Sequence, residues 1–84
     1  MAEQHFELEI FTPQQVKKYT VEWVTIESPT GSFFVGPGHS PLVSIIKTQS
    51  TIGYKPTDSA ESFLPATHGI FKVDNQKAVI LLDR

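Results

Sequence analysis

The chain is built from short β-branched and aromatic runs, each followed within a few residues by a cluster of turn-forming residues. The first run alternates strictly. Phe6, Leu8 and Ile10 would share one face and Glu7 and Glu9 the other, as in a half-buried strand. No ten-residue segment has the 3.6-residue apolar period of a helix. The sequence therefore predicts an all-β fold, a small antiparallel β-sandwich or flattened barrel of about 8–10 short strands with no substantial helix.

Further strands are expected wherever such a run lies between turn signals. The expected ranges are 19–26, 31–35, 42–47, 50–55, 61–64, 70–73 and 78–82. Thr12, Pro13 and Gln15 are the cap, first-position and third-position residues of a helix start, so one helical turn is predicted before the long second strand. Pro65 cannot donate a ladder hydrogen bond, so the strand that it interrupts is expected at a sheet edge or at a bulge.

Composition is consistent with one small domain over residues 1–84. No cysteine is present, so neither a disulfide nor a thiolate metal site can stabilise so small a core. The longest apolar run, 78–82, is far shorter than the about 20 residues of a membrane-spanning helix, and the first residues lack the pattern of a secretory signal. Seven Lys and Arg against nine Asp and Glu give a net charge of −2 without a basic patch. This charge argues against nucleic acid and favours a protein partner.

The most closely specified loop joins the third and fourth expected strands. Pro37 and Gly38 suit the two central positions of a type II turn, because proline fixes φ at the first and glycine accepts a positive φ at the second. Pro41 then favours an extended conformation at Ser40. His39 is therefore expected to be held in a fixed position.

His39 could act as a catalytic base, a metal ligand or an interface residue. The sequence offers neither a Gly-x-Ser-x-Gly elbow nor an identifiable carboxylate to orient His39. We therefore favour a histidine that hydrogen-bonds backbone groups of its own turn, or one at an interface, over a catalytic histidine. His5, His39 and His68 lack the paired spacing of zinc ligands. Glu7 and Glu9 could be a carboxylate pair like that of a glycosidase, but we interpret them as a solvated strand face. The sequence thus predicts no catalytic residue, metal or cofactor.

Three segments carry large apolar residues on both faces: 21–26, 42–46 and 78–82. One face of each can fill the core, whereas the other needs a cover that a chain without a helix cannot supply. Either strongly curled sheets make a two-sided core, or a permanent protein interface covers the second face. The residues alone leave both alternatives open.

The loop between the third and fourth expected strands also carries a family resemblance. The pattern Gly-x-x-x-x-x-Pro-Gly-His-x-Pro-Leu over 31–42, with Thr12-Pro13 before it and 68–73 after it, resembles the epsilon subunit of the F-type ATP synthase over nearly the whole chain. The resemblance implies that family's N-terminal β-sandwich. It also implies a non-catalytic central-stalk subunit that links the gamma subunit to the membrane ring of c subunits and couples proton flow to ATP synthesis.

Positions and location follow from the same resemblance. A ring-facing turn would comprise Ser28, Pro29, Thr30, Gly31 and Ser32, and a loop near the junction of gamma and ring would comprise Pro37, Gly38, His39, Ser40 and Pro41. The chain would associate with the membrane only through the complex, on the cytoplasmic side of a bacterial inner membrane or the equivalent face of another energy-transducing membrane.

The chain also departs from the family's pattern. Ser32 stands where an acidic residue is common, Phe34 where glycine is usual, and Gly36 where a bulky apolar residue is usual. Thr48-Gln49 replaces a Pro-Gly pair, and His68 the first glycine of a Gly-Gly pair.

Other members of the family continue into a C-terminal helical hairpin that binds ATP in some and inhibits hydrolysis in many. We expect this chain, which ends at Arg84, to support coupling without that tail and without bound ATP. The alternative from another class is a stand-alone ligand- or protein-binding β-sandwich that uses the Pro-Gly-His loop.

Overall fold

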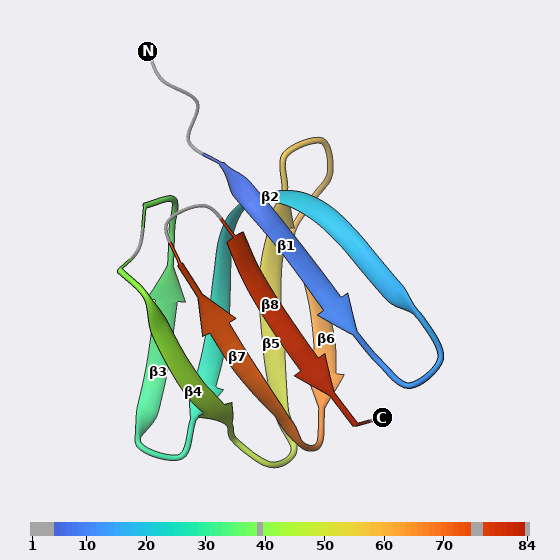
Figure 1. Cartoon of the computed structure of the whole chain (residues 1–84). Helices are drawn as coiled ribbons and strands as arrows, with labels where there is room; N and C mark the ends of the chain where they lie inside the picture. The colour runs from blue at the N-terminus through green and yellow to red at the C-terminus, as the bar shows by residue number, and fades with distance from the viewer. Residues whose placement is uncertain (1–4, 39, 75–76, 84) are drawn as a thin grey trace.

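The computed structural model describes residues 5–38, 40–74 and 77–83, and the regular structure in these ranges is all β-strand (Figure 1). Eight strands follow one another along the chain: β1 (Phe6–Phe11), β2 (Val16–Ser28), β3 (Gly31–Val35), β4 (Leu42–Ile46), β5 (Ser50–Pro56), β6 (Ser62–Ala66), β7 (Gly69–Val73) and β8 (Lys77–Leu82). No helix in the described part of the chain is long and apolar enough to cross a membrane. The predicted all-β class is confirmed.

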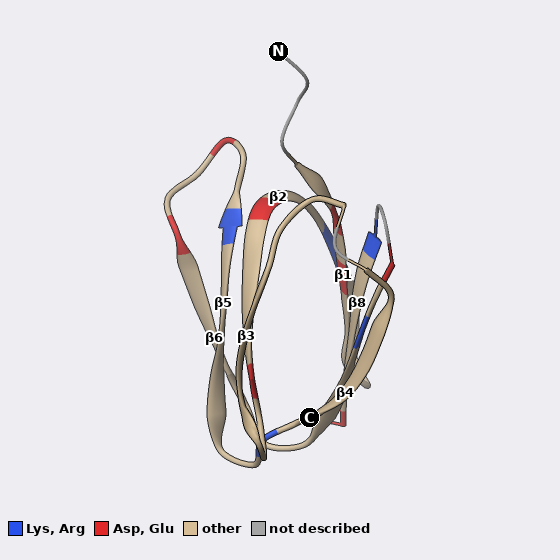
Figure 2. Ribbon diagram, turned by 90° about the vertical axis from the view of Figure 1, so that its left-hand side faces the viewer, with Lys and Arg blue, Asp and Glu red and all other residues tan. Residues whose placement is uncertain are grey.

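The 13-residue strand β2 joins the two layers of the fold. Its first part pairs antiparallel with β1, and β1 pairs parallel with β8. β7 and β4 complete the first sheet, whose strand order is β4-β7-β8-β1-β2. The pairing of β2 with β5 is irregular between Val21 and Trp23. Beyond this point β2 pairs with β3 on one side and with β5 on the other, and β6 completes the second sheet. Figure 2 shows the two layers face to face.

The core lies between the two sheets and is filled by alternate residues of the strands. Its largest fully buried side chains are Phe71, Leu8, Ile26, Ile46, Ile52, Ile80, Val21, Val24 and Val35. Full burial of each such side chain contributes about 1.5–3 kcal/mol. The alternation in β1 is as predicted, because Phe6, Leu8 and Ile10 are buried.

The helical turn predicted at Thr12–Gln15 is wrong. These residues form the hairpin between β1 and β2, in which the Thr12 N–H donates to the Gln15 carbonyl at 2.9 Å. The cap-type hydrogen bond does form, because the Gln15 N–H donates to Thr12 Oγ1 at 3.2 Å. The chain then reverses instead of coiling, because the β-branched and aromatic residues that follow pair with β1.

Pro65 lies within β6, and β6 is an edge strand of the sheet. The prediction of an edge position is therefore confirmed. Proline has no N–H to donate to a neighbouring strand. An edge strand has no neighbour on its outer side, so proline is tolerated there.

The turns gather at two opposite ends of the sandwich (Figure 1). One end carries the turns between β2 and β3, between β4 and β5, and between β6 and β7, at residues 29–30, 47–49 and 67–68. We call it the three-turn end. The other end carries the loop from β3 to β4 and the loop from β5 to β6, at residues 36–41 and 57–61.

Candidate partner-binding surfaces

The loop from β3 to β4 contains the turn that the sequence predicts. Gly38 has a φ of +76°, as the second central position of a type II turn requires. A Cβ atom at Gly38 would have no heavy atom within 4 Å, so the need for glycine comes from the backbone and not from crowding. Pro37, Gly38, Ser40 and Pro41 are exposed, whereas His39 lies outside the described residues.

The turn between β2 and β3 is held by the buried side chain of Ser28. Its hydroxyl donates to the Gly31 carbonyl at 2.8 Å and accepts a hydrogen bond from the Thr30 N–H at 3.3 Å. Gly31 has a φ of +153°, which a side chain would rarely allow. Of the five residues predicted to face a ring, Ser28 therefore shapes the turn, and Pro29, Thr30, Gly31 and Ser32 are exposed.

The two predicted loops lie at opposite ends of the molecule, with β3 between them (Figure 1). A strand of five residues spans about 15 Å. A flat partner surface at the three-turn end would therefore meet the turn of residues 28–32 but not the loop of residues 37–41. Sequence reasoning missed this separation, although the length of the expected third strand already indicates it.

An outward-facing line of apolar side chains crosses the first sheet. Successive strand registers pair its members directly, one from each of five adjacent strands: Ile45, Ile70, Leu81, Phe11 and Val16. Ile45 is 65% exposed, Ile70 and Leu81 are 45% exposed, and Val16 is 48% exposed. We call these five residues the apolar row. Isolated domains rarely leave such a continuous line of large apolar groups uncovered.

The apolar row decides between the two alternatives for the second apolar face of the strands. The outward residues of β4 do not enter a second core, because Val43 is 66% exposed and Ile45 is 65% exposed. The curl of the sheets brings their inner faces together and leaves these outer residues in contact with solvent. The two-sided core is therefore ruled out for this face, whose apolar side chains stay exposed in the isolated chain.

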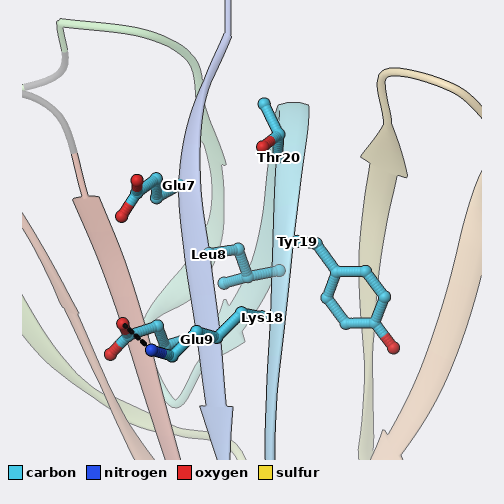
Figure 3. Close-up of a pocket in the computed structure, with 6 residues that line it drawn as sticks. All are labelled: Glu7, Leu8, Glu9, Lys18, Tyr19 and Thr20. Atoms are coloured by element: carbon cyan, nitrogen blue, oxygen red, sulfur yellow. Dashed lines mark ion pairs between the residues drawn. The ribbon is translucent and has the colours of Figure 1, made fainter.

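Beside the apolar row, the first sheet becomes charged. The carboxylate of Glu9 lies 3.1 Å from the Lys77 ammonium and 3.9 Å from that of Lys18, and Figure 3 draws the Lys18 pair. The Glu9 side chain is only 12% exposed, so it is more covered than the solvated face that we expected, whereas Glu7 is exposed. The two lysines hold Glu9 in ion pairs, so the surroundings of Glu9 differ from those of the exposed Glu7.

The outer face of the second sheet carries aromatic rings. Trp23 lies against Phe34 with the ring centroids 5.8 Å apart, and Phe63 is 65% exposed. The Phe63 ring lies over Gly53: a Cβ atom there would be 3.2 Å from Phe63 Cε1 and 2.6 Å from Thr25 Oγ1. Each outer face therefore carries exposed apolar side chains, mainly aliphatic in the apolar row of the first sheet and aromatic on the second.

The described residues contain no group of three or more His, Asp and Glu side chains close enough to hold a metal ion. His68 Nδ1 lies 4.0 Å from the Asp83 carboxylate, and both side chains are largely exposed. His5 precedes β1 and His68 lies in the turn between β6 and β7, whereas His39, the third histidine considered as a ligand, is outside the described ranges.

Comparison with known proteins identifies the family of the chain. Residues 5–84 match the family described as "ATP synthase, Delta/Epsilon chain, beta-sandwich domain". The ATP synthase epsilon chain of Geotalea daltonii is 33% identical over 84 residues, and that of Campylobacter curvus is 35% identical over 77 residues. These matches cover 99% and 90% of this chain and 59% of each relative, so the chain spans well under two thirds of their length.

Solved structures agree with the fold. A chain of the Euglena gracilis mitochondrial ATP synthase, solved with OSCP, F1 and c-ring, superposes with a TM-score of 0.88 at 15% identity, over 100% of this chain and 54% of that one. A chain of the Tetrahymena thermophila mitochondrial ATP synthase central stalk and c-ring superposes with a TM-score of 0.80 at 14% identity, over 100% of this chain and 67% of that one. The family match over residues 5–84 then decides the assignment: this chain belongs to the β-sandwich domain family of the ATP synthase delta/epsilon chain.

Proposed function

We propose that this chain is a non-catalytic part of the central stalk of an F-type ATP synthase, where it joins the gamma subunit to the ring of c subunits. The observation that carries the proposal is the apolar row, a continuous exposed line across five strands of a domain of this family. A surface of this kind fits a permanent protein partner better than it fits a substrate. In this role the chain transmits torque between gamma and the ring and so couples proton flow to ATP synthesis, without catalysing a reaction itself.

The gamma subunit is the partner that we assign to the apolar row. A permanent contact of this kind buries on the order of 2,000 Å² in total and is more hydrophobic than a transient one. The row begins at Ile45 on the edge strand β4 and ends at Val16 on β2, so the contact would cover the first sheet across its full width.

The ring of c subunits is the partner that we assign to the three-turn end. The exposed residues of its first turn, Pro29, Thr30 and Ser32, are uncharged, which suits a contact with polar loops through shape and hydrogen bonds. The loop of Pro37, Gly38, Ser40 and Pro41 lies at the other end, so we assign it to gamma rather than to the ring. This arrangement places the chain at the membrane surface, on the cytoplasmic side in a bacterium, through its partners alone.

The proposal extends to regulation by these 84 residues. Inhibition by a helical tail needs a helix, and the described residues contain none. We therefore propose that residues 1–84 support coupling and neither bind ATP nor inhibit hydrolysis themselves.

The test is binding to purified gamma with two matched variants. Ile45 and Phe63 are both 65% exposed, both lie on edge strands, and they belong to opposite sheets. We expect Ile45→Glu to weaken a one-to-one complex at least tenfold, because a charge would be buried at the contact. Phe63→Glu should bind as the unmodified chain does, and melting curves check that both variants stay folded.

Two outcomes would contradict the proposal. Failure of the unmodified chain to bind gamma at micromolar concentration would remove the central-stalk role. Loss of binding in Phe63→Glu with none in Ile45→Glu would place gamma on the aromatic face instead of the apolar row.

A further inference from the structure

The turn between β4 and β5 contains an unusual backbone conformation. Gln49 has a φ of +58°, and it is the one non-glycine residue with a positive φ in ranges 5–38, 40–74 and 77–83. Side chains with a Cβ atom clash with the backbone in this left-handed region, and glycine avoids the clash. The chain therefore keeps glutamine at a position where glycine would be more stable.

The surrounding hydrogen bonds explain why the backbone cannot relax. The Lys47 N–H donates to the Glu27 carbonyl at 2.7 Å, which ties the turn to the end of β2. The buried Ser50 hydroxyl donates to the Lys47 carbonyl at 2.7 Å and closes the turn from the other side. Gln49 is thus fixed between two anchored residues.

The same hydrogen bonds join two turns into one surface. Glu27 immediately precedes Ser28, whose hydroxyl closes the turn between β2 and β3. The turns of residues 29–30 and 47–49 are therefore connected through the Lys47–Glu27 bond at the three-turn end. Gln49 itself is exposed, so its side chain extends into solvent at this end from a backbone that the turn holds fixed.

We propose that the Gln49 side chain is a contact residue for the polar loops of the membrane ring, and that the β4–β5 turn forms the second half of the contact made by residues 29–32. This inference rests on the proposed function, because it takes the ring as the partner of the three-turn end. Strained backbone positions cluster at functional sites, and the exposed Gln49 has no role in the core. A primary amide both donates and accepts hydrogen bonds, so it fits uncharged loops that present backbone N–H and carbonyl groups.

The experiment uses the full chain in complex with gamma and a detergent-solubilised ring of c subunits as the probe. Gln49→Gly removes both the strain and the amide. We expect its melting temperature to rise by about 4 °C and its affinity for the ring to fall about fivefold. Gln49→Asn keeps an amide that tolerates the left-handed region, so it should gain stability and retain most of the binding.

A stability control is available in the hairpin between β1 and β2. Gln14, also exposed, lies in the turn between β1 and β2 and has no positive φ. Gln14→Gly should therefore not raise the melting temperature. A rise equal to that of Gln49→Gly would overturn the argument from strain.

The outcomes separate this inference from the proposed function. If the unmodified complex binds the ring and Gln49→Gly binds it equally well, the contact role of Gln49 is wrong and the proposed function stands. If the unmodified complex does not bind the ring, both are wrong. Loss of affinity in Gln49→Gly together with a raised melting temperature is the result expected.

Discussion

The rings of Tyr19 on β2 and Tyr54 on β5 lie 5.0 Å apart, centroid to centroid, at an interplanar angle of 40°. Tyr54 is 9% exposed. Burial first, and then the hydrogen bond and charge interaction with Tyr19, raise the pKa of Tyr54 from 10.0 to about 12, and a hydrogen bond with Ser62 acts in the opposite direction. The pair therefore links β2 to β5 through a phenol that resists ionisation.

The first prediction is a loss of stability in alkali that depends on Tyr54. Because its pKa in the folded state lies above the value of 10.0, the folded protein holds the phenol proton more tightly than the unfolded chain does. This stabilisation is complete below pH 10 and is lost as the pH rises towards 12. Urea unfolding at a series of pH values should show the decline. Tyr54→Phe should flatten it, and an equal decline in that variant would assign the effect to other groups.

The second prediction concerns Gly69, the first residue of β7. A Cβ atom there would lie 2.5 Å from the Leu81 backbone oxygen and 2.8 Å from Leu82 Cδ2. The backbone of a paired strand cannot move away cheaply, so Gly69→Ala should lower the free energy of unfolding by about 1–3 kcal/mol. The matched control is Gly36→Ala, where no such atom lies within 4 Å and φ is not positive. Equal urea midpoints for the two variants would contradict the crowding.

The strands were predictable because their signals are local. The alternation in β1 and the turn at Pro37 and Gly38 are each specified by two to five neighbouring residues. The structure contains the alternation and the positive φ of Gly38 as predicted. The error at Thr12 has a physical cause as well. Its hydroxyl can cap a helix or close a hairpin, and the pairing of β2 with β1, which lies outside the motif, decides between them.

The candidate surfaces were only partly predictable. Two-faced apolar strands were visible in the sequence, but the alignment of Ile45, Ile70 and Leu81 depends on strand registers, and no local pattern sets these. The parallel pairing of β8 with β1, which adds Phe11 to the row, joins residues from opposite ends of the chain. The left-handed backbone of Gln49 has no signal in the residue itself, because glycine or asparagine would normally mark it. The one pointer is that Thr48-Gln49 stands where the family commonly has Pro-Gly.

The third prediction concerns the charge of the ring contact. Ser32 pairs with Glu27 across the strands, so a lysine at position 32 would meet that carboxylate. Ser32→Lys should therefore weaken ring binding mainly by bulk, and Ser32→Gln, of similar length and no charge, should weaken it about as much. Salt weakens interactions between exposed charges, whereas the proposed contact depends on shape and hydrogen bonds. The binding of either variant should therefore change little between about 0.1 M and 1 M salt. Strong salt dependence in the unmodified complex would instead point to Glu27 or Lys47.

The last prediction concerns hydrolysis by the catalytic head. The family's inhibitory tail is a helical hairpin, whereas the described residues contain no helix and fold into a single β-sandwich body of 38 × 27 × 18 Å. We therefore expect residues 1–84 to lack the inhibitory action of such a tail. Added to the cognate head detached from the membrane, the 84-residue chain should leave the rate of ATP hydrolysis unchanged, and it should help restore proton pumping when the head is returned to membranes. Ile45→Glu serves as the control, because it should lose the pumping effect without gaining any effect on hydrolysis. Strong inhibition that added ATP relieves would show that the sandwich itself regulates the head.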